Sequence, residues 1–150
     1  MRALIQRVKY ANVSIDSSIK KGINQGLLIF LGIEKEDNID DIKWLVSKIS
    51  KLRIFDDEDG VMNRSIVDIN GQAMIISQFT LHAKTKKGNR PSYIHAAPPE
   101  ISKPLYKNFI DLFSKEIKGD VVTGKFGADM QVELLNDGPV TIWIDTKNKE

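Results

Sequence analysis

Two short apolar runs constrain the fold more than any other feature of the sequence, because neither alternates with polar residues. Residues 27–33 form one run, preceded by Gly26 and interrupted by Gly32, and residues 73–76 form the other. Short continuous runs of this kind are typical of strands that are buried on both faces. We therefore expect a sheet whose central strands are covered on each side.

The remaining pattern supplies further strands and two helices. Residues 2–15 alternate with period two and predict a half-buried strand. Other strands are expected at residues 19–23, 54–55, 72–80, 121–123, 130–135 and 140–144. Amphipathic helices are predicted at about 38–52, with Asp37 or Asn38 as N-cap, and at about 98–118, opened by proline. Because short turns join most consecutive strands, an α/β fold with a mixed or largely antiparallel sheet is favoured.

Composition narrows the possible chemistry. A length of 150 residues, 41% of them hydrophobic, suits a single domain over residues 1–150. Neither a signal peptide nor an apolar run of about 18 residues is evident, so we expect a cytoplasmic location. Cysteine is absent, which excludes disulfides and thiolate nucleophiles, and the only histidines are His82 and His95. No metal or cofactor is expected.

Charge points to one local surface. Acidic and basic residues nearly balance, and the net charge of +2 is too small for a protein that binds nucleic acid by its overall charge alone. Residues 69–99, however, contain no Asp or Glu, and they include four cations: Lys84, Lys86, Lys87 and Arg90. An anionic ligand would fit this segment, although a solvated loop that lacks acids explains the pattern equally well.

The second apolar run turns polar as it ends, at Ser77, Gln78 and Thr80. If the strand continues to Thr80, Gln78 and Thr80 share a face with His82, and a buried strand would present functional groups from a rigid support. A strand end emerging into solvent is the alternative. Thr80 and His82 would lie roughly 6 to 7 Å apart, which is long for a nucleophile and its base. No Gly-x-Ser-x-Gly motif is present, so any hydrolysis should rely on positioning and backbone donors.

Another polar segment, Asn136-Asp137-Gly138-Pro139, separates two apolar strands. Asn-Asp-Gly is a tight-turn signature, so from the residues alone a plain hairpin turn is the simplest interpretation. Because Pro139 follows Gly138, the peptide bond between them is able to adopt the cis form, which only about 5–6% of bonds before proline adopt.

Together, Ser77-Gln78-Phe79-Thr80-Leu81-His82-Ala83 and Asn136-Asp137-Gly138-Pro139-Val140-Thr141 resemble the two signature motifs of the bacterial and eukaryotic D-aminoacyl-tRNA deacylases. Residues 1–13, 88–93 and 96–100 also match segments of that family. The similarity spans essentially the whole chain, and two separated motifs in the correct order are highly specific.

The resemblance implies a three-layer α/β/β fold and a homodimer with active sites at the subunit interface. The implied reaction is hydrolysis of the ester that joins a D-amino acid to the terminal adenosine of tRNA, a carboxylic ester hydrolase activity. Glycine mischarged on alanine tRNA is also a substrate of the family. The resemblance implies no cofactor.

It also implies roles for particular residues. Gly138 and Pro139 match a pair that one subunit inserts into its partner's site, where backbone carbonyls exclude L side chains. The strand that holds the ester and the adenosine corresponds to Ser77, Gln78, Phe79 and Thr80. Phe126 and Met130 belong to a segment whose backbone holds the substrate ammonium group.

Arg7 is a candidate to fix the Gly-Pro loop, with an exposed strand arginine as the alternative. Four cations in residues 69–99, the segment without Asp or Glu, would bind the tRNA phosphates. These are Lys84, Lys86, Lys87 and Arg90.

Two catalytic routes and three rival functions are left open. The ribose 2′-hydroxyl of tRNA or Thr80 would drive hydrolysis, and the lack of any nucleophile elbow, thiol or metal set favours the RNA-assisted route. One rival is an animal-type relative that acts on L-alanine mischarged on threonine tRNA, although its motifs differ from those found in this chain. The others are a non-catalytic RNA-binding module using residues 84–90, and a generic esterase with Thr80 as nucleophile.

Overall fold

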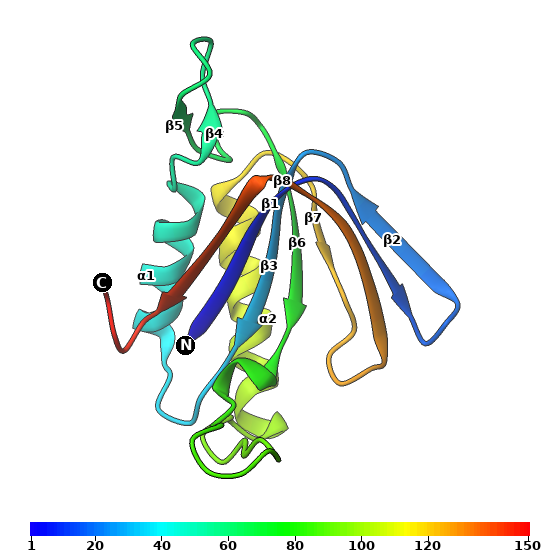
Figure 1. Ribbon diagram of the computed structural model, residues 1–150, viewed down its shortest axis with the longest axis vertical. Coiled ribbons are helices and arrows are strands. Elements are labelled where there is room, and N and C mark those ends of the chain that lie inside the picture. The colour runs from blue at the N-terminus through cyan, green and yellow to red at the C-terminus, as the bar shows by residue number, and fades with distance from the viewer.

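A computed structural model describes all residues from Met1 to Glu150 (Figure 1). The elements follow in the order β1 (Arg2–Ile15), β2 (Ile19–Ile23), β3 (Gly26–Gly32), α1 (Ile39–Ser50), β4 (Phe55–Asp56), β5 (Met62–Arg64), β6 (Gln72–Ser77), the 3₁₀ helix η1 (Phe79–His82), α2 (Pro99–Glu116), β7 (Val121–Thr123) and β8 (Met130–Asp145).

Six strands form one mixed sheet in the order β2-β1-β3-β6-β7, and β8 pairs with β1. β1 is antiparallel to β2, β3 and β8, whereas β3, β6 and β7 run parallel to one another. The carboxyl ends of these three parallel strands therefore meet at one edge of the sheet. β4 and β5 form a separate two-stranded hairpin.

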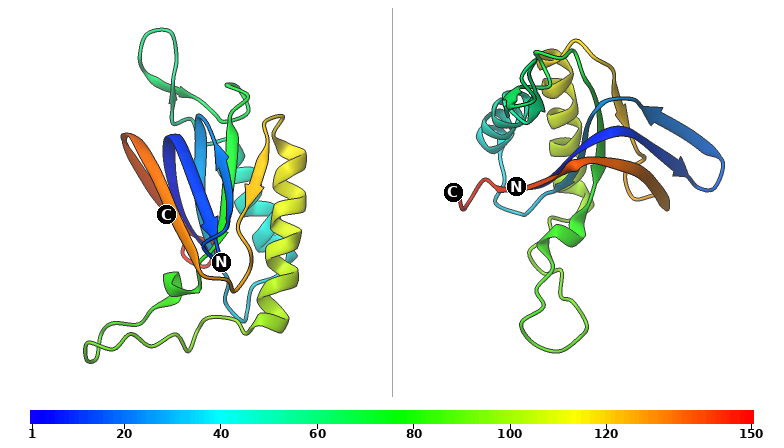
Figure 2. Two further views of the ribbon diagram at one scale, coloured as in Figure 1. Left: turned by 90° about the vertical axis from the view of Figure 1, so that its right-hand side faces the viewer. Right: turned by 45° about the horizontal axis from the view of Figure 1, so that its top comes forward.

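The sheet is covered on both faces, which gives three layers. Both helices lie on the same side of the sheet (Figure 2), where Leu27, Ile29 and Ile75 join the larger hydrophobic core. On the other side Leu28 and Met74 join a second core, which β1, β2 and β8 close with their apolar side chains. Neighbouring residues of β3 and β6 thus point into different cores. The predicted α/β/β fold with central strands buried on both faces is confirmed.

Both predicted helices are present, each slightly shorter than expected. Asn38 caps α1, since its side-chain oxygen accepts a hydrogen bond from the Asp40 N–H at 2.8 Å. In return, the Asn38 N–H donates to the side-chain carboxylate of Asp41 at 3.0 Å. This reciprocal capping box satisfies N–H groups that the helix itself leaves unpaired. α2 begins at Pro99 and ends at Glu116. Neither helix combines the length and apolar character needed to cross a membrane.

The polar end of β6 differs from the sequence prediction. The strand stops at Ser77, and the chain then turns into η1, where the Leu81 N–H donates to the Gln78 carbonyl at 3.3 Å. Gly32 permits this turn, because a Cβ there would lie 2.9 Å from the Gln78 carbonyl oxygen. The expectation that Gln78, Thr80 and His82 share one face of a strand is therefore wrong. The short strand predicted at 54–55 is shifted by one residue in β4.

The segment around Gly138 also differs from the prediction, because it is not a hairpin turn. β8 is one 16-residue strand that pairs with β1 on both sides of this segment. Gln6 pairs with Thr141 and Val8 pairs with Asn136, so residues 137–140 all stand opposite Arg7. The extra residues leave the ladder as a bulge, which we call the Gly-Pro bulge. The Asn-Asp-Gly signature correctly predicted an irregular backbone at this segment. The prediction that the segment joins two strands as a hairpin turn is wrong, because both halves belong to β8 and pair with β1.

Candidate functional site

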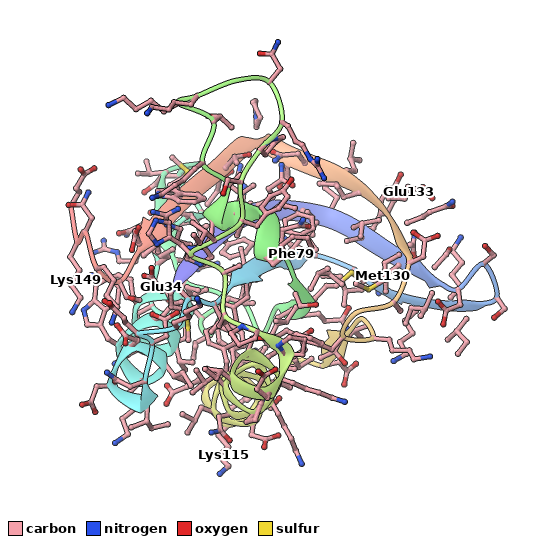
Figure 3. All side chains as sticks on the ribbon, turned by 90° about the horizontal axis from the view of Figure 1, so that it is seen from below. Glu34, Phe79, Lys115, Met130, Glu133 and Lys149 are labelled. Carbon is pink, nitrogen blue, oxygen red and sulfur yellow. The ribbon has the colours of Figure 1, made fainter.

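A cavity of about 580 Å³ lies beyond the carboxyl ends of β3 and β6, the position where α/β sheets commonly bind ligands. Figure 3 labels two of its lining residues, Phe79 and Met130. The wall of the cavity is mostly apolar, with a few polar groups. The contributing segments are the ends of β3 and β6, the start of η1, the loop before α2, the turn at 126–129 and the start of β8. Ser77, Gln78 and Phe79 line it from one side.

An exposed aromatic pair stands at the rim of the cavity. The Phe79 side chain is 56% exposed, and its ring lies edge-on to Tyr93 with centroids 4.9 Å apart. A large apolar side chain that remains this exposed at a cavity offers a surface on which a planar group can stack.

The backbone next to Phe79 offers hydrogen-bond donors. The Gln78 N–H donates a hydrogen bond to the Leu31 carbonyl at 2.8 Å, which fixes the end of β6 to β3. The hydrogen bonds of η1 begin only with the Leu81 N–H, so the N–H groups of Phe79 and Thr80 have no partner within that helix. Such donors suit an oxygen that carries negative charge.

Thr80 is half-buried and does not line the cavity. The Gln78 side-chain amide donates a hydrogen bond to the Thr80 hydroxyl oxygen. No histidine lines the cavity to activate the hydroxyl. His82 is only 1% exposed and is not part of the wall, and burial lowers the pKa of its imidazole. The structure therefore brings Ser77, Gln78 and Phe79 to the cavity but leaves Thr80 outside it.

Phe126 and Met130 line the opposite side of the cavity, together with the backbone between them. Tyr106 supports this wall from α2, with its ring centroid 5.8 Å from that of Phe126. The Tyr106 hydroxyl donates to the Ile75 carbonyl at 2.7 Å, and burial raises the pKa of this phenol above its usual range. Tyr106 thus stays neutral and links the turn at 126–129 to β6.

Several residues of the wall were not among the predicted site residues, including Tyr93, Ala96, Ala97 and Asp129. The first three lie in the loop segments that already resembled the deacylase family, so the resemblance held a signal for them. Asp129 is the only Asp, Glu, Lys, Arg or His residue of the wall, and it lies between Phe126 and Met130 in a segment that also resembled the family. No group of three or more His, Cys, Asp or Glu side chains is arranged to hold a metal ion.

The four predicted cations extend from the loop between η1 and α2. All four side chains are exposed, and the base of the loop is closed by paired hydrogen bonds between Lys84 and Ser92 at 2.8 and 3.0 Å. Figure 1 shows this loop projecting beyond the sheet on the same side as η1. Lys84, Lys86, Lys87 and Arg90 thus form an exposed basic loop next to the cavity.

The Gly-Pro bulge lies away from the cavity of its own chain, at the opposite end of the sheet from η1 (Figure 1). Gly138 and Pro139 are exposed, and the bond between them is cis. Asn136 closes the base of the bulge, since its side chain accepts from the Val140 N–H at 2.8 Å and donates to the Thr141 hydroxyl at 3.0 Å. Asn136 and Thr141 of the motif therefore shape the bulge that carries Gly138 and Pro139.

Arg7 fixes this bulge from beneath. Its side chain is only 8% exposed, and its Nε donates to the Asp137 carbonyl at 2.9 Å. The alternative of an exposed strand arginine is therefore wrong. Gly138 has φ of 138°, and a Cβ there would lie 2.8 Å from Val140 Cγ2 and 3.3 Å from Arg7 Nη2. Only glycine fits between the two without displacing the bulge.

Comparison with known proteins gives one consistent result. The model of a family described as D-Tyr-tRNA(Tyr) deacylase matches residues 4–145. A D-aminoacyl-tRNA deacylase of Bacteroides fragilis is 62% identical over 150 residues, and one of Chromobacterium violaceum is 57% identical, with 100% of both chains covered in each case. The fold, the cavity and these matches define a hydrolase. The chain belongs to the D-Tyr-tRNA(Tyr) deacylase family, which confirms the resemblance found in the sequence.

Solved structures agree with this assignment at the level of the fold. A structure titled c-Myc DNA Unwinding Element Binding Protein superposes with a TM-score of 0.91 at 37% identity, covering 97% of this chain and 98% of the other. A structure described as a probable eukaryotic D-amino acid tRNA deacylase gives a TM-score of 0.81 at 15% identity, covering 95% and 97%. The second similarity shows that the fold persists where little sequence is shared.

Proposed function

We propose that this protein hydrolyses the ester of D-aminoacyl-tRNA and so returns free tRNA and a D-amino acid in the cytoplasm. The observation that carries the proposal is the composition of the cavity. Phe79 and Tyr93 offer a stacking surface for the terminal adenine, and the backbone N–H of Phe79, which has no partner within η1, is the donor offered to the ester oxygen. Asp129 is suited to the ammonium group of the aminoacyl moiety. The proposal includes glycine mischarged on alanine tRNA as a second substrate.

Catalysis in this proposal is assisted by the RNA. The cavity wall holds no histidine, lysine or cysteine, and Thr80 stands outside it. The ribose 2′-hydroxyl of the terminal adenosine is then the group next to the ester that is able to transfer a proton. The protein contributes by positioning the ester and by donating backbone hydrogen bonds to the developing oxyanion.

Selection of the D enantiomer depends on a second copy of the chain. Gly138 and Pro139 are exposed and lie outside their own cavity, so they are free to enter the cavity of a partner subunit in a homodimer. Their carbonyl groups would occupy the space that an L side chain needs, and a D side chain would point elsewhere. Glycine has no side chain to exclude and is accepted.

Hydrolysis itself is tested directly with purified protein and D-tyrosyl-tRNA. Free D-tyrosine should appear at a rate that is proportional to the protein concentration, and glycine should be released from mischarged alanine tRNA as well. A protein that binds the charged tRNA without releasing the amino acid would instead be the non-catalytic RNA-binding module.

Phe79→Ala is expected to raise KM for D-tyrosyl-tRNA about tenfold, because stacking of one base on an aromatic ring contributes about 1–3 kcal/mol. The side chain is 56% exposed, so its loss should leave the unfolding temperature nearly unchanged. Steady-state kinetics with melting curves measure both effects. An unchanged KM would remove Phe79 from the adenosine site.

Neutralising Lys86 and Lys87 with glutamine is expected to weaken tRNA binding and to lower its salt dependence. The slope of log K against log salt should fall by about one for each phosphate that the protein no longer neutralises. Fluorescence titration at several salt concentrations measures this. Lys115→Gln with Lys118→Gln is the matched control and should leave the slope unchanged. Both cations are exposed, Lys115 in the last turn of α2 (Figure 3) and Lys118 just beyond it.

A further inference from the structure

The β4–β5 hairpin contacts the Gly-Pro bulge through a single guanidinium group. Arg7 Nη1 donates to the Ile54 carbonyl at 2.7 Å and to Asp56 Oδ1 at 3.1 Å, while Nε of the same side chain donates to the Asp137 carbonyl. Ile54 and Asp56 lie at the start of the hairpin, whereas Asp137 opens the bulge. One planar group therefore connects two segments that are far apart in the sequence.

The charges around Arg7 explain why an acid is placed in the hairpin. The guanidinium is nearly buried, and a buried cation is costly unless it is paired. The carboxylate of Asp137 lies 3.6 Å from Arg7 Nε, but Lys9 also approaches that carboxylate, at 3.8 Å. Asp56 supplies a second negative charge, so that two acids face these two cations.

The geometry of Arg7 leaves it little freedom. The planar fork of a guanidinium binds several acceptors in fixed directions, which a lysine ammonium cannot reproduce. With Nη1 held by Ile54 and Asp56, the direction of Nε toward the Asp137 carbonyl is set. Nη2 would also lie 3.3 Å from a Cβ at position 138, so the guanidinium supports the bulge beneath Gly138.

We propose that the base of the β4–β5 hairpin, through Asp56 and the Ile54 carbonyl, positions the Gly-Pro bulge by fixing Arg7, which makes Asp56 a positioning residue for enantiomer selection. The role in selection rests on the proposed function, whereas the role in fixing the bulge does not. The acidic segment at residues 56–60 thereby gains a function at its first residue.

Asp56→Ala is the direct test, with Asp59→Ala as the matched control, because Asp59 lies in the same hairpin and its side chain has no contact with Arg7. The Asp56 side chain is 51% exposed, so the pair with Arg7 is partly screened. The preference for D- over L-tyrosyl-tRNA should fall about fivefold in Asp56→Ala and stay constant in Asp59→Ala. Asp56→Asn, which keeps an acceptor oxygen, should lie between them.

A double-mutant cycle with Arg7→Lys separates positioning from a general loss of stability. If Asp56 acts through Arg7, then Asp56→Ala should change selectivity in the wild-type background and have no further effect in Arg7→Lys. Equal effects in both backgrounds, or no effect in either, would overturn the proposal.

Hydrogen exchange gives a second measurement that does not depend on catalysis. The Val140 amide, which is bonded to Asn136 within the bulge, should exchange about fivefold faster in Asp56→Ala and at the wild-type rate in Asp59→Ala. Faster exchange in a protein that does not hydrolyse D-tyrosyl-tRNA would uphold the positioning of the bulge and reject the proposed function. Unchanged exchange would reject the positioning itself.

Discussion

Replacing Gly138 with alanine is expected to lower kcat/KM for D-tyrosyl-tRNA about 100-fold, which corresponds to about 2.7 kcal/mol of lost transition-state stabilisation. The added Cβ would lie 2.8 Å from Val140 Cγ2 and 2.9 Å from the Val140 nitrogen, at a φ that L side chains rarely adopt. The bulge must move to relieve both clashes, and under the proposed function its carbonyl groups would then no longer fit the cavity of a partner subunit. Gly60→Ala is the matched control, since Gly60 also has positive φ but has nothing within 4 Å of a Cβ.

Mixed dimers test whether the bulge acts in the partner subunit. Gly138→Ala would be combined with a variant in which the cavity is filled, such as Ala96→Trp. Each variant alone should be nearly inactive. A dimer with one chain of each kind contains one site built from an intact cavity and an intact bulge, so mixing should restore part of the activity. If mixing restores nothing although mixed dimers form, the bulge acts within its own chain or not at all.

Removing the 2′-hydroxyl from the terminal adenosine of the substrate is expected to slow hydrolysis at least about 100-fold, the usual contribution of a proton-transferring group. Neither histidine lines the cavity, Thr80 is outside it, and Asp129, the only Asp, Glu, Lys, Arg or His residue of the wall, is assigned to the substrate ammonium group in this proposal. Single-turnover rates on 2′-deoxy and normal D-tyrosyl-tRNA measure the effect. Binding of both RNAs should be similar, which separates chemistry from affinity.

Thr80→Ala provides the contrasting variant. Its hydroxyl accepts a hydrogen bond from the Gln78 amide, and losing one such bond costs about 0.5–1.5 kcal/mol, or about two- to tenfold in rate. A much larger loss in Thr80→Ala, together with normal hydrolysis of the 2′-deoxy substrate, would make Thr80 the nucleophile and would overturn the RNA-assisted route.

The layered fold was predictable because it depends on local patterns. The runs at 27–33 and 73–76 required burial on both faces, and the two cores provide it. Asn38 and Pro99 likewise mark helix starts through backbone chemistry that is local to each residue. The main error lay at residues 78–82, where packing of η1 against Gly32 overrides the continuation of the strand.

The site was predictable only in part, because its geometry depends on contacts between distant segments. Asn-Asp-Gly correctly indicated an irregular backbone at residues 136–138, but only the pairing of β8 with β1 shows that the segment is a bulge opposite Arg7. Nothing local to Asp56 indicates that its side chain approaches Arg7. The basic loop was evident from charge alone, since it needs no partner to be recognised.

The most direct test of the whole account is a side-by-side measurement of kcat/KM on D-tyrosyl-tRNA and L-tyrosyl-tRNA with the same purified protein. We predict rapid hydrolysis of the D substrate and a far lower kcat/KM on the L substrate. Equal rates on both enantiomers would contradict selection by the Gly-Pro bulge, and no turnover of either would contradict the proposed function.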